Sequence, residues 1–436
     1  MVPKIKCKNN AKPAKNGSEK KFNSVPKHCP NPATKLYSAK ASESAAFIQS
    51  ETYLKMPSPQ QRILEGQPSK PNMQTKQHNF GAGPCILAPE VLQKAAEAVI
   101  DWNSTGLSIL EVSHRSSAFE KVMEQTRQLV RETLKVPKDY QILLLQGGAS
   151  TQFSMLAENL LSASGRRKAC YIDTGYFAQK AIAQAKLFGE VEVVASSKKG
   201  GYSYIPKLEQ HTFSGAYLHL TSNNTIEGTE FFDFPKSDIP LVCDMSSDIF
   251  SREINVKDFG LIYAGAQKNL GPAGMTLVII SDELLNGIQY ELPAMSDYRV
   301  HAQNGSMYNT PPVFAIYVAM LNLQWLKSQG GVKAMERRNR QKSDLLYQAL
   351  EDSKLFHATA EKKHRSRMNI TFKSHDPAHE KGFLEFASQN GVVGLKGYRT
   401  VGGFRASLYN ALPMESVVHL ISVISQYERQ QTSNHG

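Results

Sequence analysis

The sequence is poor in cysteine, and the few cysteines follow no regular spacing. Five cysteines occur in 436 residues, an odd number, and no two of them form a CxxC or another metal-ligand spacing. Disulfide-held secreted domains and structural zinc sites both depend on such regular patterns. We therefore expect a protein of a reducing compartment, with no disulfide framework and no metal site.

Long hydrophobic runs are also missing. No stretch approaches the roughly 20 apolar residues that a membrane-spanning helix requires, and the N-terminus lacks the apolar region of a secretory signal. A hydrophobic content of 41% and a charged content of 21% are typical of an ordinary globular protein. The length is sufficient for a large core and two domains. We expect a cytoplasmic protein with no membrane partner.

Acidic residues are scarce at the N-terminus. Residues 1–77 contain about fourteen Lys and Arg against four Glu, so most of the net charge of +12 lies there. Positive charge concentrated in a terminal segment does not create a basic groove on the folded part. No nucleic-acid partner is therefore expected for the rest of the chain. The segment is rich in Lys, Asn, Ser, Pro and Gln without hydrophobic periodicity, which predicts a disordered extension.

Three interpretations of this extension stay open. It could be an organelle import peptide, although it uses Lys where such peptides use Arg. It could bind nucleic acid or another partner. It could also be an upstream extension without a folded role, since Met73 stands just before the ordered pattern. We favour the third interpretation.

From Asn79 onward the pattern is that of a mixed α/β protein. Strand-like runs alternate with helical segments from Asp139, which predicts a mostly parallel sheet with right-handed crossovers. We expect a large sheet domain over residues 78–335 and a smaller α+β domain over residues 336–436. Residues 78–90 are candidates for packing against the smaller domain.

Lys268 stands between two apolar runs that read as buried strands. Burying an ammonium group without a partner costs roughly several kcal/mol, so a lysine at this position requires an explanation. Schiff-base formation with an aldehyde cofactor supplies one, because it requires a neutral, nucleophilic amine. Taken alone, however, such a segment is more often an ordinary surface lysine in a glycine-rich turn, and the rest of the chain has to decide.

Other chemically useful residues also follow predicted strands. Asp244 ends an apolar strand and needs a cationic partner, which a pyridinium nitrogen would provide. Ser150 follows a Gly-Gly turn, where it can cap a helix whose free N–H groups suit a phosphate. Phe177 follows an Asp-Thr-Gly turn and is either core or a stacking partner for a flat ring. Open α/β sheets bind ligands at this edge.

Ten short motifs then identify a family resemblance. They are NFGAGP at 79–84, EVSHRS at 111–116, GGASTQF at 147–153, DTGYF at 173–177, NNTIEG at 223–228, DMSSDIFSR at 244–252, YAGAQKNLGPAG at 263–274, NGSMYNTPP at 304–312, RSRMN at 365–369 and LKGYRTVGGFRASLYNA at 395–411. In this order they make the chain resemble the class V, fold-type I pyridoxal-phosphate aminotransferases, most of all those members that act on phosphoserine. The resemblance covers about residues 79–430.

The resemblance implies pyridoxal 5'-phosphate as cofactor and a role for each matching residue. Lys268 would carry the cofactor and act as the catalytic base, and Asp244 would hold its pyridine nitrogen. Phe177 occupies the ring-stacking position, which is tryptophan in many relatives. The other implied cofactor contacts are Ala149, Ser150, Thr225, Gln267, Asn309 and Thr310. The last two would come from the neighbouring subunit of a homodimer.

Substrate binding is implied for a set of basic residues. Arg405 matches the clamp for the α-carboxylate, and the matches for the distal anion are His114, Arg115 and Arg399. The chain departs from some relatives at two positions. Ser150 replaces an arginine and Tyr398 a histidine, and both changes keep hydrogen-bonding capacity while removing positive charge.

The implied reaction exchanges an amino group between O-phospho-L-serine and 2-oxoglutarate in serine biosynthesis, with 4-phosphohydroxy-L-threonine of pyridoxine biosynthesis as a further substrate. An alanine or serine–glyoxylate aminotransferase and a cysteine desulfurase are the enzyme alternatives. A desulfurase needs an exposed nucleophilic cysteine, and neither Cys85 in its Gly-Pro turn nor Cys243 in a buried strand suits that role. A protein that binds RNA or a membrane surface through its basic tail is the alternative outside enzymes, and its binding would depend on salt.

Overall fold

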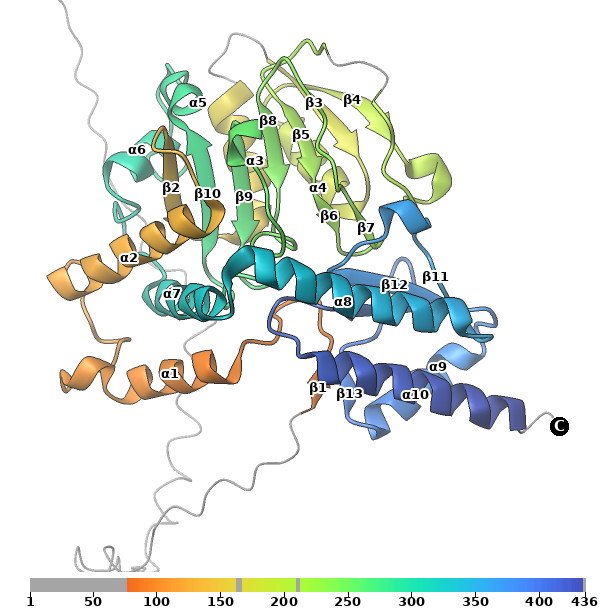
Figure 1. Ribbon diagram of the computed structural model, residues 1–436. Helices are drawn as coiled ribbons and strands as arrows, with labels where there is room; N and C mark the ends of the chain where they lie inside the picture. Colours follow the sequence, from red (N-terminus) through yellow and green to blue (C-terminus); the bar gives the residue numbers. More distant parts are fainter. Residues whose placement is uncertain (1–76, 162–166, 209–211, 434–436) are drawn as a thin grey trace, which may run out of the picture. The chain divides into compact units, whose positions relative to one another are not determined.

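The computed structural model describes residues 77–161, 167–208 and 212–433 (Figure 1). The basic extension expected over residues 1–77 lies, apart from its last residue, outside this described part. No helix among the described residues is long and apolar enough to cross a membrane.

A seven-stranded sheet forms the centre of the structure. In order across the sheet its strands are β2 (Tyr140–Leu145), β10 (Thr276–Ser281), β9 (Leu261–Gly265), β8 (Leu241–Asp244), β5 (Leu218–Thr221), β3 (Lys168–Asp173) and β4 (Glu190–Ser196). β10 is antiparallel to both neighbours, whereas the strands from β9 to β4 pair in parallel. Their near-continuous apolar sequences suit a sheet covered on both faces. The predicted mostly parallel sheet is confirmed.

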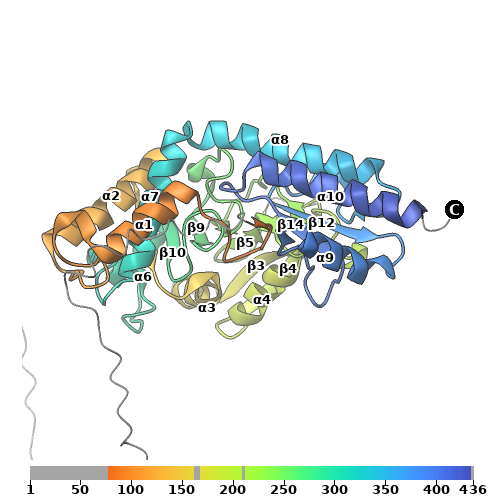
Figure 2. The same ribbon diagram turned by 90° about the horizontal axis from the view of Figure 1, so that it is seen from below.

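Helices cover the two faces of this sheet. They are α1 (Pro89–Ile100), α2 (Ser117–Leu134), α3 (Gly148–Leu161), α4 (Tyr176–Ala185), α5 (Asp282–Asn286), α6 (Tyr298–Gln303) and α7 (Val313–Ser328). Alternate strand residues face different cores. Ile262 and Ile279 pack with residues of α1, α2 and α7, whereas Tyr263 and Val278 pack with residues of α3 and α4. Figure 2 shows these two helix layers on opposite sides of the strands.

The C-terminal part has its own small sheet and core. Its elements are α8 (Gly331–Asp352), β11 (Phe356–Ala358), β12 (Asn369–Ser374), α9 (His379–Gln389), β13 (Val392–Val393), β14 (Phe404–Ser407) and α10 (Met414–Ser433). The antiparallel order is β11-β12-β14, and the core is built around Phe356, Phe372 and Phe404. β1 (His78–Asn79) pairs in parallel with β13, and Phe80 is buried in the same core. The first described residues therefore pack on the C-terminal part.

Short elements complete the chain. Two of them form a hairpin between β5 and β8, namely β6 (Asn223–Asn224) and β7 (Thr229–Glu230). The 3-10 turns are η3 (Trp102–Ser104), η4 (Lys198–Gly200), η5 (Val256–Asp258) and η6 (Lys362–His364).

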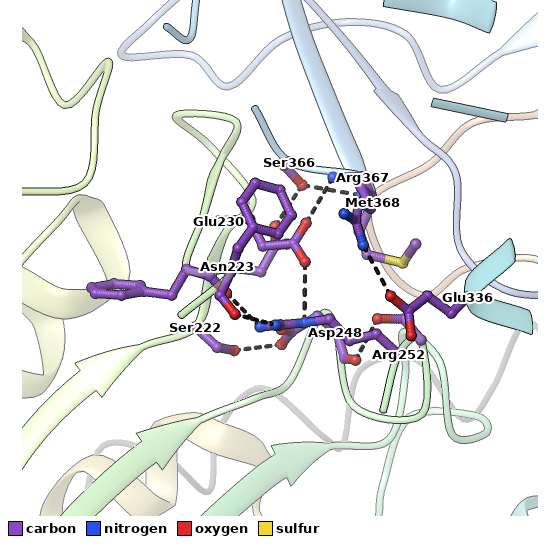
Figure 3. Close-up of polar contacts among 12 residues, drawn as sticks. Ser222, Asn223, Glu230, Asp248, Arg252, Glu336, Ser366, Arg367 and Met368 are labelled. Atoms are coloured by element: carbon purple, nitrogen blue, oxygen red, sulfur yellow. Dashed lines mark hydrogen bonds and ion pairs between the residues drawn. The ribbon is translucent and has the colours of Figure 1, made fainter. Parts of the chain in front are cut away.

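A buried ionic network ties the hairpin to the C-terminal part (Figure 3). Arg252 Nε lies 3.2 Å from Glu230 Oε1, and its Nη2 lies 3.2 Å from Asp248 Oδ2. Glu230 also accepts the N–H of Arg367 at 2.8 Å, and Arg367 Nη1 donates to Glu336 of α8 at 3.3 Å. The turn that follows β8 is thus held against the segment before β12 and against α8.

Candidate active site

The site lies where the parallel strands end at their carboxyl edge. The register pairs Thr221 of β5 with Asp244 of β8, and Asp244 with Tyr263 of β9. The turn after β9 carries Lys268, and the turn after β3 leads into α4 at Phe177. Strand ends in register bring residues far apart in sequence to one edge, as the α/β pattern predicted.

Lys268 presents an amine without a protein partner. Its Nζ lies 5.3 Å from the centre of the Phe177 ring and makes no hydrogen bond or ion pair with any described residue. Burial lowers the pKa of Lys268 to about 8, although attraction to Asp244 opposes the shift, and Arg405 adds to it. About a tenth of the amine is therefore neutral at pH 7, far more than for a solvated lysine, and this neutral form is the one that nucleophilic use requires.

Asp244 has one oxygen satisfied and one left for a ligand. Its Oδ1 accepts the N–H of Ser246 at 2.9 Å and the Ser246 hydroxyl at 2.6 Å. The Ser246 hydroxyl in turn accepts the N–H of Gly265, at the end of β9, at 3.1 Å. Oδ2 accepts no hydrogen bond from the described chain. Burial raises the pKa of Asp244, while Ser246 and Lys268 oppose that shift, so a cation at Oδ2 would stabilise the carboxylate.

Ser246 was not predicted as a site residue. A serine two positions after a strand-terminal aspartate is the available signal, because such an aspartate commonly accepts the N–H two residues on. The same pattern is frequent in ordinary turns, so the sequence alone does not distinguish the two cases.

The N-terminus of α3 supplies the expected anion site. Gly147 and Gly148 have φ of +95° and +68°, and a Cβ at Gly147 would lie 2.2 Å from Thr151 Oγ1, so glycine is required there. The N–H groups of the first turn, including those of Ala149 and Ser150, lack helical acceptors and favour a phosphate. The expected capping role of Ser150 is wrong, because it lies inside the helix rather than before it.

These features together fit pyridoxal phosphate. The unpaired amine can react with an aldehyde, and the unbonded carboxylate oxygen can bind a pyridine nitrogen. The aromatic ring beside the amine can stack on a flat ring, and the helix N-terminus can bind a phosphate.

Two more predicted cofactor residues adjoin Lys268 and Arg405. Gln267 is half-buried beside Lys268, and a Cβ on Gly83 would meet its side chain at 3.6 Å. Thr225 is buried after β6, and its carbonyl accepts Nη1 of Arg405 at 3.1 Å. Gln267 is thus the chain neighbour of Lys268, and the Thr225 backbone contacts Arg405.

Asn309 and Thr310 lie beside the start of α3. The Thr310 carbonyl accepts the side-chain N–H of Gln146 at 2.7 Å. Asn309 lines, with Gly147 and Thr151, a cavity of about 230 Å³. Both contacts are within the one chain.

The predicted substrate residues fall into two groups. Arg405 in β14 is half-buried and bound to the Thr225 carbonyl, and its Nε is buried without a hydrogen-bond partner among the described residues. Arg399 is exposed in the loop before β14. Tyr398 next to it packs on Tyr176 at a ring distance of 5.1 Å, and the charges of both Arg399 and Arg405 act on Tyr398.

His114 and Arg115 lie apart from this group. They precede α2, Arg115 is exposed, and their side chains bond to each other at 3.4 Å. Within the described chain, no hydrogen bond, ion pair or ring contact joins either of them to Lys268 or Arg405. Their segment leads into α2, which packs on the sheet face away from α4.

Cys85 lies unexpectedly close to the site lysine. Its thiol contacts the Lys268 carbonyl, and its N–H donates to the Gln267 carbonyl at 3.0 Å. Burial raises the pKa of the Cys85 thiol to about 12. A thiol that stays protonated is a poor nucleophile, which argues against a desulfurase.

The aminotransferase class-V family model matches residues 77–420. A phosphoserine aminotransferase of Flavobacterium johnsoniae is 51% identical over 354 residues, which cover 81% of this chain and 99% of that protein.

Solved structures of phosphoserine aminotransferases are also similar to this chain. The phosphoserine aminotransferase of Bacillus circulans subsp. alkalophilus superposes with a TM-score of 0.80 at 43% identity, covering 82% of this chain and 100% of that one. A pyridoxal-phosphate-bound phosphoserine aminotransferase of Trichomonas vaginalis gives a TM-score of 0.75 at 34% identity, covering 80% of this chain and 100% of that one.

Proposed function

The chain belongs to the class V aminotransferase family and is a pyridoxal-phosphate-dependent transaminase, and we propose that it acts on O-phospho-L-serine and 2-oxoglutarate. The products are 3-phosphohydroxypyruvate and L-glutamate. The observation that carries this proposal is the unpaired amine of Lys268, which is attracted by Asp244 and repelled by Arg405. An amino acid with one acidic group besides its α-carboxylate suits a site where Arg405 lies near this amine.

The cofactor binds through groups already described. Pyridoxal phosphate supplies an aldehyde that accepts the amino group and a ring that withdraws electrons from the substrate. The first-turn N–H groups at Ala149 and Ser150, with Gln267, would bind its phosphate. Phe177 would stack on its ring, and Thr225 would bond on the side of the ring hydroxyl.

Lys268 and Asp244 handle the protons. Lys268 Nζ would remove the proton from the substrate Cα, to which its lowered pKa is suited. Asp244 Oδ2 would hold a proton on the pyridine nitrogen, since Ser246 occupies Oδ1.

Arginines select the substrate. Arg405 binds the α-carboxylate, anchored by the Thr225 carbonyl. Arg399, His114 and Arg115 bind the distal phosphate of phosphoserine or the distal carboxylate of glutamate. A second copy of the chain brings His114 and Arg115 to the site, since they lie apart from Arg405 within one chain.

We accordingly propose a homodimer whose two active sites share residues. Asn309 and Thr310 would reach the cofactor phosphate of the partner subunit. Each copy contains a large domain over residues 78–335 and a small one over residues 336–436, and β1 joins the small domain by its pairing with β13.

Mixing two inactive variants tests the shared site. Lys268→Ala removes the base from its own site, whereas Arg115→Ala removes a distal contact from the partner's site. Refolding the two together should restore activity, because one site of each mixed dimer then has both residues. Activity that never exceeds that of the separate variants would contradict the shared site. Lys268→Ala refolded with Lys268→Arg is the control.

Absorbance of the purified protein tests the reaction. Phosphoserine should remove the long-wavelength band of bound cofactor, and 2-oxoglutarate should restore it. Lys268→Ala should lack this band. A response to alanine or serine with glyoxylate, but not to phosphoserine, would replace the proposal by a glyoxylate aminotransferase. Sulfide release from cysteine that Cys85→Ala abolishes would identify a desulfurase.

Two finer points belong to the proposal. The enzyme serves serine synthesis in the cytoplasm, and it accepts 4-phosphohydroxy-L-threonine because that substrate keeps the α-amino acid and the phosphate. The same absorbance assay with that substrate tests the second point. A fusion of residues 1–77 to a fluorescent protein tests the first, and accumulation of the fusion in an organelle would contradict it.

A further inference from the structure

Glu227 lies at a junction that the reaction scheme above does not use. It is in the turn between β6 and β7, two residues after Thr225. Its backbone carbonyl accepts the Thr371 hydroxyl of β12 at 3.1 Å. A Cβ at the next residue, Gly228, would lie 2.2 Å from Thr371 Oγ1. The turn is therefore pressed directly against the small sheet that carries Arg405.

The side chain of Glu227 acts as the missing cap of α4. Gly175 precedes this helix and has no side chain to bond to its N–H groups. Glu227 Oε1 instead accepts the N–H of Tyr176, the first helical residue, at 2.7 Å. A Cβ at Gly175, whose φ is +156°, would lie 2.4 Å from the Glu227 carboxyl carbon. A carboxylate at a helix N-terminus is stabilising, and this one fixes the turn before Phe177.

The second carboxyl oxygen has no such partner. Oε2 of Glu227 is buried and makes no hydrogen bond within the described chain. Asp173, at the end of β3, repels the carboxylate, and Arg405 attracts it. The Tyr202 hydroxyl, which donates to Asp173 at 3.1 Å, also interacts electrostatically with the Glu227 carboxylate. Glu227, Tyr202 and Lys373 line one cavity of about 390 Å³.

We propose that Glu227 is a positioning residue that caps α4 beside the cofactor and, when it ionises, weakens the binding of substrate carboxylate at Arg405. The second part rests on the proposed function, since it assumes that Arg405 binds a carboxylate. The ionised Glu227 competes for the charge of Arg405, whereas the protonated form leaves that charge to the substrate. Substrate binding and proton binding at Glu227 then favour each other.

The electrostatic balance supports this linkage at physiological pH. Burial, the largest cause, raises the pKa of Glu227 to about 7, with Asp173 acting in the same direction. The N–H of Tyr176 and the charge of Arg405 oppose the shift. A glutamate with this pKa changes its charge between about pH 6 and about pH 8.

Dicarboxylate binding tests the linkage. The probe is glutarate, which lacks an amino group and does not react, and its Kd for the holoenzyme is measured by calorimetry between about pH 6 and about pH 8.5. The wild-type Kd should rise with pH about three- to tenfold more than the Kd of Glu227→Gln. Gln keeps an oxygen for the Tyr176 N–H but carries no charge. The comparison between the two proteins removes the contribution of other groups that change their charge over this range.

Hydrogen exchange tests the cap without any substrate. The Tyr176 amide should exchange about tenfold faster in Glu227→Ala than in Glu227→Gln. Glu120→Ala, an exposed change in α2, is the control and should leave that amide unchanged.

The linkage to Arg405 and the cap of α4 are contradicted by different results. Equal pH dependence of the Kd in wild type and Glu227→Gln would overturn the linkage, and equal exchange in Glu227→Ala and Glu227→Gln would overturn the cap. A wild type that binds no glutarate at any pH contradicts the proposed function and the linkage together. In that case hydrogen exchange of the Tyr176 amide still tests the capping role of Glu227.

Discussion

Asp244 receives both donors of Ser246 on one carboxylate oxygen, at 2.9 Å from the N–H and 2.6 Å from the hydroxyl. The hydroxyl also accepts the Gly265 N–H, so that Ser246 links the ends of β8 and β9. The carboxylate is therefore oriented by the chain before any ligand binds, and its second oxygen accepts no hydrogen bond from the described chain.

Replacing this hydroxyl should weaken cofactor binding. Ser246→Ala removes a hydrogen bond to a charged group, for which a loss of about tenfold in cofactor affinity is expected. Equilibrium dialysis of pyridoxal phosphate against the apoprotein measures it. Ser246→Thr keeps the hydroxyl and serves as control. Equal affinity in the Ala variant and wild type would show that the backbone N–H alone orients Asp244.

The amine of Lys268 should give the cofactor association rate a characteristic pH dependence. Only the neutral amine attacks an aldehyde, and burial lowers the pKa of Lys268 to about 8. The association rate with the apoprotein should therefore rise with pH and level off above about pH 8, followed by absorbance. Asp244→Asn should move the inflection to lower pH, because the attraction that favours the charged amine is lost. An inflection near pH 10, roughly that of a solvated lysine, would contradict the burial argument.

Loss of Arg252 should destabilise the fold strongly. Arg252→Met leaves Glu230 and Asp248 buried without their cation, which should reduce the free energy of unfolding by about 3–5 kcal/mol. Chemical denaturation measures this loss. Arg340→Met, which removes a more exposed ion pair to Glu336 at 3.7 Å, is the control and should change stability by less than about 1 kcal/mol.

The deficit of Arg252→Met should shrink as the pH falls. Burial already raises the pKa of Glu230 to about 7 in the folded protein, against the attraction of Arg252. A carboxyl whose folded pKa exceeds its unfolded value binds protons more readily when folded, so low pH favours the folded state. The deficit should be smaller at about pH 5.5 than at about pH 8. A deficit that grows on acidification would contradict this assignment.

A buried lysine should stabilise the C-terminal part. Lys342 Nζ in α8 donates to the carbonyls of Leu408, Tyr409 and Leu412 at 2.9–3.1 Å. Lys342→Met keeps the volume but leaves three buried acceptors unpaired, which should lower the free energy of unfolding by about 2–4 kcal/mol. Lys333→Met on the exposed side of the same helix is the control. Similar melting temperatures for both variants would show that water replaces the ammonium.

Much of this protein was predictable from its sequence. The mostly parallel sheet follows from apolar strands that alternate with amphipathic helices. The aminotransferase family and pyridoxal phosphate follow from ordered motifs around Lys268 and Asp244, and the comparisons confirm both. The roles of individual site residues stay predictions, and the structure adds their distances and charges.

The local sequence decided which residues could do the chemistry, since a lysine between apolar strands and a strand-terminal aspartate are visible as patterns of type and spacing. Tertiary structure alone decided their surroundings. Ser246 holds one oxygen of Asp244, and Glu227 caps a helix 51 residues before it. Such contacts depend on which strand ends become neighbours in the sheet, a choice made by the packing of the whole chain rather than by adjacent residues.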